Sequence, residues 1–373
     1  MRITILQGPF MPVPPIYGGA VEKLWFALGK EFVKAGHTVI HISKKDKSLP
    51  LRDVIEGVSH IRINSFNAPK NPFLSKVFDL IYSTRAHKIL PNADILITNT
   101  FFLPFFFIER SKGNVLASVE RIPKGQLKFY KNSVHFRANS SFVKKAILAE
   151  VPSGISRTVL VPNPLPDLQD LKKSSKDKER IILYVGRIHP EKGIITLLKA
   201  FEEISESWNH GYRLRIIGPS SFAHGGGGEL YECGLKKRFA GLKQIEWVGP
   251  VFDDKNLAHE YLKASIFVYP SIAEKGETFG LAPLESMAYG CVPIVSDLEC
   301  FKDFITNRKN GLVFNHRQNA ANNLNLSLMH LMELNSNDLQ IFQMEALKVR
   351  NSHSTAKIAN QFLDYFEKIL DSV

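Results

Sequence analysis

The sequence PSIAEKGETFGLAPLESMAYG, residues 270–290, decides how the second half of this chain is organised. An apolar strand ends at Tyr269, and we expect a helix to begin near Gly280. Pro283 fits the first turn of that helix, because an amide donor is not needed there. Gly290 then ends the helix. The stretch therefore predicts a strand, a loop and a short helix, in that order.

Two carboxylates bracket the start of this helix. Glu277 lies on the loop before it, and Glu285 lies in its second turn. The backbone amides of Phe279, Gly280 and Leu281 have no partners inside the helix, so the positive end of the helix dipole favours a phosphate there. One carboxylate would then accept hydrogen bonds from a sugar and the other from a ribose diol. The stretch predicts a nucleotide-sugar site, and two solvated acids on a surface helix are the alternative.

A pair of cations follows another strand of the second half. Residues 181–185 form a continuous apolar run, and the sequence GRIHPEKG, residues 186–193, follows it. Arg187 and Lys192 therefore lie on one loop at the carboxyl end of a strand, where open α/β sheets bind ligands. There they can neutralise a departing diphosphate without a metal ion, Arg as a fork and Lys as a point charge. A chance pair of surface cations is the alternative.

These two motifs resemble those of a known enzyme family. The setting ExFGLxPLExMAxG around Glu277 and Glu285 resembles the EX7E signature of the retaining GT4 glycosyltransferases with the GT-B fold, and GRxxxxKG resembles their diphosphate-binding loop. The resemblance implies that Glu277 lies at the donor sugar and that Glu285 binds the ribose. It also implies that Arg187 and Lys192 stabilise the leaving diphosphate, and that the turn at Val251 lines the base pocket.

The first half begins as a βαβ unit. An apolar strand over residues 3–6 is followed by a proline-rich loop, by Gly18 and Gly19, and by a helix and a second strand over residues 38–42. The glycines lack the GxGxxG spacing of a dinucleotide fingerprint. They resemble the GGxE segment of GT4 enzymes with one extra residue before Glu22, which implies that their amides approach the donor diphosphate and the acceptor. Alternatively, Glu22 is a helix N-terminal acid stabilised by the dipole.

Glu120 follows a strand that we expect over residues 114–119. Many GT4 enzymes have a His at the end of this strand, next to the donor sugar, and Glu120 occupies that place here. Glu120 is therefore a candidate catalytic residue that binds a sugar hydroxyl or orients the acceptor. The alternative is an ion pair with Arg121.

Length and composition indicate two globular domains. The 373 residues are many for a single core, and 44% of them are hydrophobic. The proline-rich residues 162–167 and the polar residues 172–180 are typical of a linker. With the resemblance, this predicts an α/β protein of the GT-B class with two Rossmann-like doubly wound domains facing a cleft. Residues 1–165 plus 355–373 would bind the acceptor, and residues 166–354 would bind the nucleotide sugar.

The excess of positive charge lies in the first half of the chain. Residues 1–165 hold 23 Lys and Arg against 10 Asp and Glu, whereas residues 166–373 hold 25 against 26. Such a basic half indicates an anionic partner, either a membrane surface or a phosphate-bearing acceptor, and a solvated basic face is the alternative.

We expect the apolar run FFLPFFFI, residues 101–108, to be buried; if exposed, it could enter a bilayer. We find no nucleic-acid recognition module in the sequence.

The three cysteines, Cys233, Cys291 and Cys300, form no CxxC pair and no metal-binding spacing, so we expect core thiols in a reducing compartment. No segment of the sequence is long and apolar enough to span a membrane, and residues 3–6 are too short for a signal peptide. We therefore expect a cytoplasmic protein that a membrane contact would hold at the inner face. We expect no metal ion and no cofactor other than the sugar donor.

The predicted reaction is the transfer of a hexose, with retention, from a nucleotide-diphosphate sugar to a saccharide or lipid-linked acceptor of an envelope polysaccharide. UDP-glucose is the donor we favour, because it is common among the relatives. The resemblance implies a front-face path in which the leaving phosphate accepts the proton of the acceptor. A nucleotide-sugar epimerase of the same fold and a non-catalytic protein that binds sugar nucleotides are the alternatives.

Overall fold

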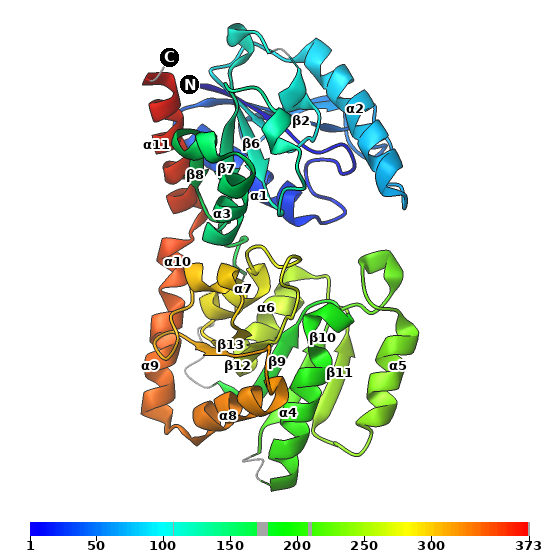
Figure 1. Ribbon diagram of the computed structural model, residues 1–373, viewed down its shortest axis with the longest axis vertical. Coiled ribbons are helices and arrows are strands. Elements are labelled where there is room, and N and C mark those ends of the chain that lie inside the picture. Colours follow the sequence, from blue (N-terminus) through cyan, green and yellow to red (C-terminus); the bar gives the residue numbers. More distant parts are fainter. Residues whose placement is uncertain (107, 170–177, 208–210, 372–373) are drawn as a thin grey trace. The chain divides into compact units, whose positions relative to one another are not determined.

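The computed structural model describes residues 1–106, 108–169, 178–207 and 211–371. The chain divides into two compact units (Figure 1): an N-terminal unit of Met1–Pro166 with His353–Val373, and a C-terminal unit of Asp167–Ser352. Each unit is built on a sheet of mainly parallel strands, which confirms the two predicted Rossmann-like domains. Most of the predicted polar run over residues 172–180 lies outside the described residues.

The N-terminal unit contains an eight-stranded sheet with the order β3-β4-β2-β1-β5-β6-β7-β8. All neighbours are parallel except β3 and β4, which are antiparallel. The order changes direction at β1, so a ligand-binding point is expected at its carboxyl end, where the loop to Gly18 begins. The strands are β1 (Arg2–Leu6), β2 (Thr38–Lys44), β3 (Arg52–Ile55), β4 (Val58–Ile63), β5 (Ile95–Thr98), β6 (Asn114–Val119), β7 (His135–Ala138) and β8 (Thr158–Leu160).

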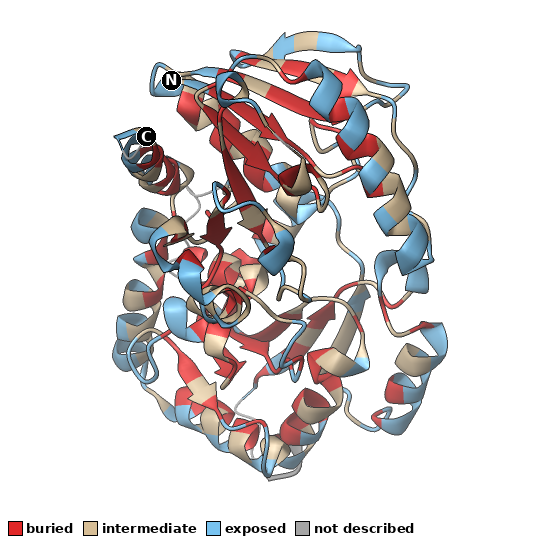
Figure 2. Ribbon diagram, turned by 45° about the horizontal axis from the view of Figure 1, so that its top comes forward, coloured by how far each residue is buried: buried red, intermediate tan, exposed pale blue. Residues whose placement is uncertain are grey.

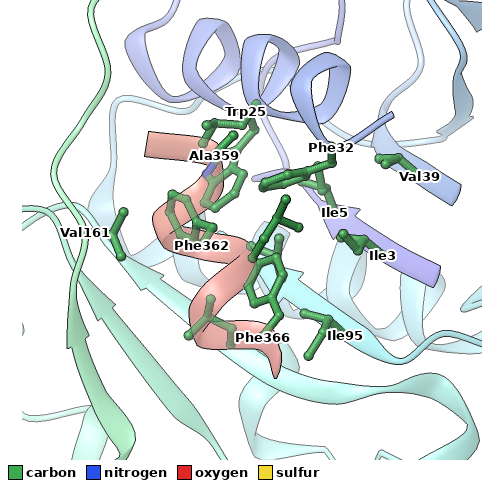
Figure 3. Packing of buried hydrophobic residues seen from close by; sticks show 14 of the residues in the cluster. Ile3, Ile5, Trp25, Phe32, Val39, Ile95, Val161, Ala359, Phe362 and Phe366 are labelled. Atoms are coloured by element: carbon green, nitrogen blue, oxygen red, sulfur yellow. The ribbon is translucent and has the colours of Figure 1, made fainter. Parts of the chain in front are cut away.

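The α-helices that accompany this sheet in the described part of the chain are α1 (Ala20–Lys34), α2 (Pro72–Ile89), α3 (Ser141–Glu150) and α11 (Thr355–Asp371). The last of them belongs to the C-terminal end of the chain, yet it packs into the core of the N-terminal unit (Figure 3). The ring of Phe362 lies 5.2 Å from that of Trp25, and the ring of Phe366 lies 5.8 Å from that of Phe32. These four aromatic side chains are completely buried, so α11 is part of this core.

The C-terminal unit contains a six-stranded parallel sheet with the order β11-β10-β9-β12-β13-β14. Its strands are β9 (Glu179–Val185), β10 (Arg213–Ile217), β11 (Ile245–Gly249), β12 (Ala264–Tyr269), β13 (Val292–Ser296) and β14 (Leu312–Phe314). Its helices are α4 (Ile194–Ser207), α5 (Glu229–Arg238), α6 (Asp254–Lys263), α7 (Leu281–Ala288), α8 (Ala320–Glu333), α9 (Ser336–Leu347) and α10 (Val349–Ser352). Because β9 and β12 are neighbours, the two motifs that follow them meet at one edge of the sheet.

Strands β12 and β13 are buried along their whole length, which is typical of central parallel strands covered on both faces (Figure 2). Cys291 and Cys300 are buried as predicted, but the prediction for Cys233 is wrong. Cys233 lies on α5, a helix with few apolar residues, and it is exposed. None of the helices among the described residues combines the length and apolar character that crossing a bilayer requires.

Candidate active site

The loop and helix of the EX7E motif have the predicted form. Helix α7 begins at Leu281, and Gly280 before it adopts φ 91°, a conformation that side chains other than glycine rarely adopt. A Cβ atom at Gly280 would also lie 2.4 Å from the ring of Phe301, so both the space and the backbone require glycine. The first turn of α7 therefore presents backbone amides at the carboxyl edge of the sheet, an arrangement that favours an anion.

A buried ion pair joins the two motifs. The Nζ atom of Lys192 lies 2.6 Å from Oε2 of Glu277, and the two side chains are 7% and 11% exposed. The loops approach closely because Gly193 has no side chain: a Cβ atom there would lie 1.9 Å from the carbonyl oxygen of Pro270. Gly193 also adopts φ 68°. The structure thus brings Lys192 and Glu277, which are far apart in the sequence, into one site.

Arg187 is held at the rim of the same site. Its guanidinium lies 2.8 Å from Oε1 of Glu191 and donates a hydrogen bond to the carbonyl oxygen of Gly225. The side chain is 40% exposed, so its charge remains available to a ligand. Glu191 was not predicted as a site residue; its position four residues after Arg187 on the same loop is the sequence signal for this pair.

The glycines over residues 225–228 are bonded to two neighbouring segments of the chain. The amide of Gly227 donates to the carbonyl oxygen of Ile188 at 2.8 Å, and the amide of Gly228 donates to that of Ser220 at 2.7 Å. A Cβ atom at Gly226 would lie 2.2 Å from the latter oxygen. The glycines therefore let this loop pack directly against the loop of Arg187.

Tyr269 and Tyr184 complete the surroundings of Glu277, and neither was predicted as a site residue. Burial raises the pKa of Tyr269 well above its usual value, and the nearby Glu277 carboxylate raises it further. Lys192 Nζ lies 5.3 Å from the centre of the Tyr269 ring. Tyr184, whose pKa is raised by burial and by Glu277, donates a hydrogen bond to the carbonyl oxygen of Arg187 at 2.9 Å. Both hydroxyl groups thus stay protonated and act as donors.

Glu285 and Val251, two further donor candidates of this unit, lie on separate elements. Glu285 lies on α7, and its Oε2 atom is 3.5 Å from the hydroxyl group of Tyr261. Val251 follows β11, the edge strand that is two strands away from β9 on the sheet. The carboxyl ends of these parallel strands point to the same edge, which is where the motifs lie.

In the N-terminal unit, Gly18 and Gly19 adopt φ 81° and 96°, and Gly19 caps α1. A Cβ atom at Gly19 would lie 2.2 Å from Oε2 of Glu22, so the Glu22 carboxylate lies over the start of its own helix. Burial raises the pKa of Glu22, and a hydrogen bond with Gln7 opposes that shift. This position agrees with the alternative in which Glu22 is a helix N-terminal acid.

Glu120 pairs with a buried cation, but that cation is Arg137 and not Arg121. The Arg137 side chain is completely buried and also donates to the carbonyl oxygen of Val161 at 2.7 Å. Ser118 Oγ donates to Oε1 of Glu120 at 2.7 Å. Residues 118 and 137 are register partners on β6 and β7, and this strand pairing is what brings the ion pair together.

Among the described residues, no three His, Cys, Asp or Glu side chains are arranged to hold a metal ion.

Comparison with known proteins shows a similarity in the C-terminal unit. Residues 167–341 match the model of the family "Glycosyl transferases group 1". The chain is 23% identical to spore coat protein SA of Bacillus subtilis over 86% of this chain and 87% of that protein. It is 32% identical to the O-antigen chain mannosyltransferase RfbU of Salmonella typhimurium, over 35% of this chain and only 34% of the relative's length.

Solved structures show the same fold over the whole chain. Sucrose-phosphate synthase of Thermosynechococcus elongatus matches with a TM-score of 0.77 and 20% identity, covering 100% of both chains. HepE of Anabaena, solved in complex with UDP and glucose, matches with a TM-score of 0.70 and 14% identity over 99% of this chain and 100% of that one. The two sheets are those of the GT-B fold. Residues 167–341, which make up most of the C-terminal unit, are thus similar to the group 1 glycosyl transferases.

Proposed function

We propose that this protein transfers a hexose from UDP-glucose, without a metal ion, to a saccharide or lipid-linked acceptor in the synthesis of an envelope polysaccharide. The C-terminal unit binds the donor and the N-terminal unit binds the acceptor. The observation that carries the proposal is the buried Lys192–Glu277 pair beside the first turn of α7, because it combines a cation, a sugar-binding carboxylate and an anion site.

Each candidate residue has a role in the proposed reaction. Arg187 and Lys192 stabilise the diphosphate as it leaves, together with the backbone at Phe279, Gly280 and Leu281. Glu277 accepts hydrogen bonds from the sugar hydroxyl groups, and Glu285 accepts them from the ribose diol. The leaving phosphate accepts the proton of the acceptor. Val251 lines the base pocket, and the amides of Gly18 and Gly19 approach the diphosphate from the N-terminal unit.

Two observations bear on the identity of the donor. HepE, which shares the fold, was solved with UDP and glucose, and this supports UDP-glucose. A relative that is 32% identical over 133 residues carries the name of a mannosyltransferase, which supports a mannose donor as the second candidate. Both donors present a diphosphate and a ribose diol to the same motifs.

The donor is tested by melting the pure protein with UDP, UDP-glucose, GDP and GDP-mannose, without added metal. A ligand that binds only the folded state stabilises it by about 2.7 kcal/mol at a hundred times its Kd. We expect a higher melting temperature with UDP and UDP-glucose. A shift with only the guanosine compounds would replace the proposed donor, and no shift with any nucleotide would refute the transferase assignment.

The variant Glu285→Ala tests the ribose contact. We expect it to abolish the shift with UDP, because it removes the carboxylate that accepts from the ribose diol. Glu179→Ala is the matched control, since Glu179 lies at the amino end of β9, at the opposite edge of the same sheet, and is 45% exposed. The control variant should keep the full shift in melting temperature.

Product analysis separates the alternative functions: an epimerase returns an altered donor, and a non-catalytic protein returns the donor unchanged.

We further propose that the N-terminal unit contacts an anionic membrane through α2. Residues 73, 76, 80, 84 and 87 lie on one helix face by their spacing, and Phe73 and Leu80 are 71% and 40% exposed. The only acid of α2 is Asp79, which is buried and accepts hydrogen bonds from the amides of Phe101 and Phe102. The exposed face of α2 is therefore apolar and basic, which suits anionic lipid.

In the neighbouring run over residues 101–108, Leu103 and Pro104 are buried, and Phe101, Phe102, Phe105 and Phe106 are half-buried; residue 107 lies outside the described residues. Lys76 Nζ lies 5.3 Å from the centre of the Phe101 ring. The run was expected to be buried, and among its described residues this is fully true only of Leu103 and Pro104. The half-buried rings adjoin the exposed face of α2, and this supports a continuous membrane-binding surface.

The membrane contact is tested by co-sedimentation with vesicles of neutral lipid and with vesicles that contain anionic lipid. We expect binding to the anionic vesicles alone, and a several-fold loss of the bound fraction in Phe73→Ser with Lys76→Glu. Ile341→Ser is the control, because Ile341 is a 60% exposed apolar residue of α9 in the other unit. Equal binding of the α2 variant and wild type would refute this surface.

A further inference from the structure

Besides the Lys192 contact, the loop that carries Glu277 takes part in a group of four side chains. We call this group the 316 cluster: Glu274, Asp297, His316 and Arg317. Glu274 lies on the loop itself, three residues before Glu277. Asp297 follows β13, and His316 and Arg317 follow β14. The cluster therefore joins the loop after β12 to the ends of the next two strands.

His316 lies between two carboxylates. Its Nδ1 atom contacts Oδ1 of Asp297, and its Nε2 atom lies 3.0 Å from Oε1 of Glu274. The ring is 4% exposed, and the backbone amide of His316 also donates to Asp297 at 3.2 Å. In its protonated form the imidazole donates to both carboxylates, and in its neutral form to one.

Arg317 spans the same two acids. Its guanidinium lies 2.5 Å from Oδ2 of Asp297 and 2.9 Å from Oε1 of Glu274. Glu274 thus has two partners on the segment after β14. It is 51% exposed, and the half-exposed pair alone would contribute little, but the buried ring of His316 fixes the geometry.

The cluster is linked to Glu277 through a tight turn. The amides of Gly276 and Glu277 both donate to the carbonyl oxygen of Ala273 at 3.0 Å. Glu274 and Glu277 therefore belong to one turn, and a shift of the first moves the second. On the other side, the amide of Ile272 donates to the carbonyl oxygen of Glu191 at 2.9 Å.

We propose that the 316 cluster positions Glu277 for the sugar of the donor, and so determines recognition of the sugar but not of the nucleotide. This inference rests on the proposed function, because it requires Glu277 to contact the donor sugar. Two of the nucleotide contacts depend on other anchors: Arg187 is held by Glu191 and Gly225, and Glu285 lies on α7. Loss of the cluster changes the part of the binding energy that comes from the sugar.

The test compares the Kd of UDP with that of UDP-glucose by calorimetry, which needs no acceptor. In Glu274→Ala we expect the Kd of UDP to stay within about twofold and the Kd of UDP-glucose to rise about tenfold, as for coupling through a positioning contact. His316→Asn should also raise the Kd of UDP-glucose and leave that of UDP unchanged, since the shorter side-chain amide of asparagine still reaches Asp297 but not Glu274. Glu179→Ala, which breaks a half-exposed pair with Arg213 at the opposite edge of the sheet, should leave both Kd values unchanged.

The double variant sharpens the result. If the two residues act as one unit, Glu274→Ala together with His316→Asn weakens UDP-glucose no further than either change alone. An unchanged Kd for UDP-glucose in Glu274→Ala, or equal weakening of UDP and UDP-glucose, would overturn the inference. Failure of the wild-type protein to bind UDP and UDP-glucose would instead refute the proposed donor, and the inference with it.

Discussion

Replacement of Arg187 by Ala is expected to lower kcat about 100-fold to 1000-fold, the usual effect of removing one group that stabilises charge in a transition state. The guanidinium is the most exposed cation of the site, and it is oriented by Glu191 and by the carbonyl oxygen of Gly225. Turnover is measured as release of nucleoside diphosphate from the donor that raises the melting temperature. The free energy of unfolding should change by less than about 1 kcal/mol, because the ion pair is half-exposed.

Two further variants sharpen this prediction. Arg187→Lys keeps the charge but loses the planar fork, so its kcat should lie between those of wild type and Arg187→Ala. Arg213→Ala removes a guanidinium that is 48% exposed at the amino end of β10, and its kcat should equal that of wild type. Unchanged turnover in Arg187→Ala would remove the diphosphate role from this residue.

Replacement of Glu120 by Ala is expected to destabilise the N-terminal unit by about 3–5 kcal/mol. The change leaves the completely buried Arg137 guanidinium without its carboxylate, and an unpaired buried charge is costly. Glu120→Gln keeps a hydrogen-bond acceptor at the same place and should cost less. The measurement is the urea midpoint of unfolding, followed by fluorescence and by circular dichroism.

The Glu120 prediction also separates a structural role from a catalytic one. If Glu120 binds the sugar or the acceptor, Glu120→Ala lowers kcat while the urea midpoint stays at the wild-type value. Glu56→Ala is the control, because Glu56 forms a pair with Lys30 and is 57% exposed. Breaking that pair should cost at most about 1 kcal/mol.

Local sequence signals were sufficient for the elements that carry the site. Gly280, Pro283 and Gly290 predicted the start and the end of α7 to within two residues, since glycine and proline restrict the backbone wherever they occur. The strand before each motif was also predicted, because a buried parallel strand is a continuous apolar run. The exposed residues of β3 show only a short alternation, and that strand was not predicted.

Partners that meet through strand pairing could not be predicted in this way. Arg137 follows Glu120 by 17 residues, and only the register of β6 and β7 brings them together. His316 lies 42 residues after Glu274 and meets it across the ends of three strands. A single sequence contains no signal for such contacts, because either residue alone is an ordinary polar residue of a loop.

The position of α11 has a consequence for the order in which the chain can fold during synthesis. The C-terminal unit is one continuous segment, so all of its residues are available before the last helix is made. The N-terminal unit is made first but completed last, because Ile358, Phe362, Phe366 and Ile369 fill a core whose other side chains come from residues 1–161. Until α11 leaves the ribosome, Trp25 and Phe32 lack their aromatic neighbours and present an apolar surface. The nascent chain must keep that surface from aggregating for the time needed to synthesise about half of the protein.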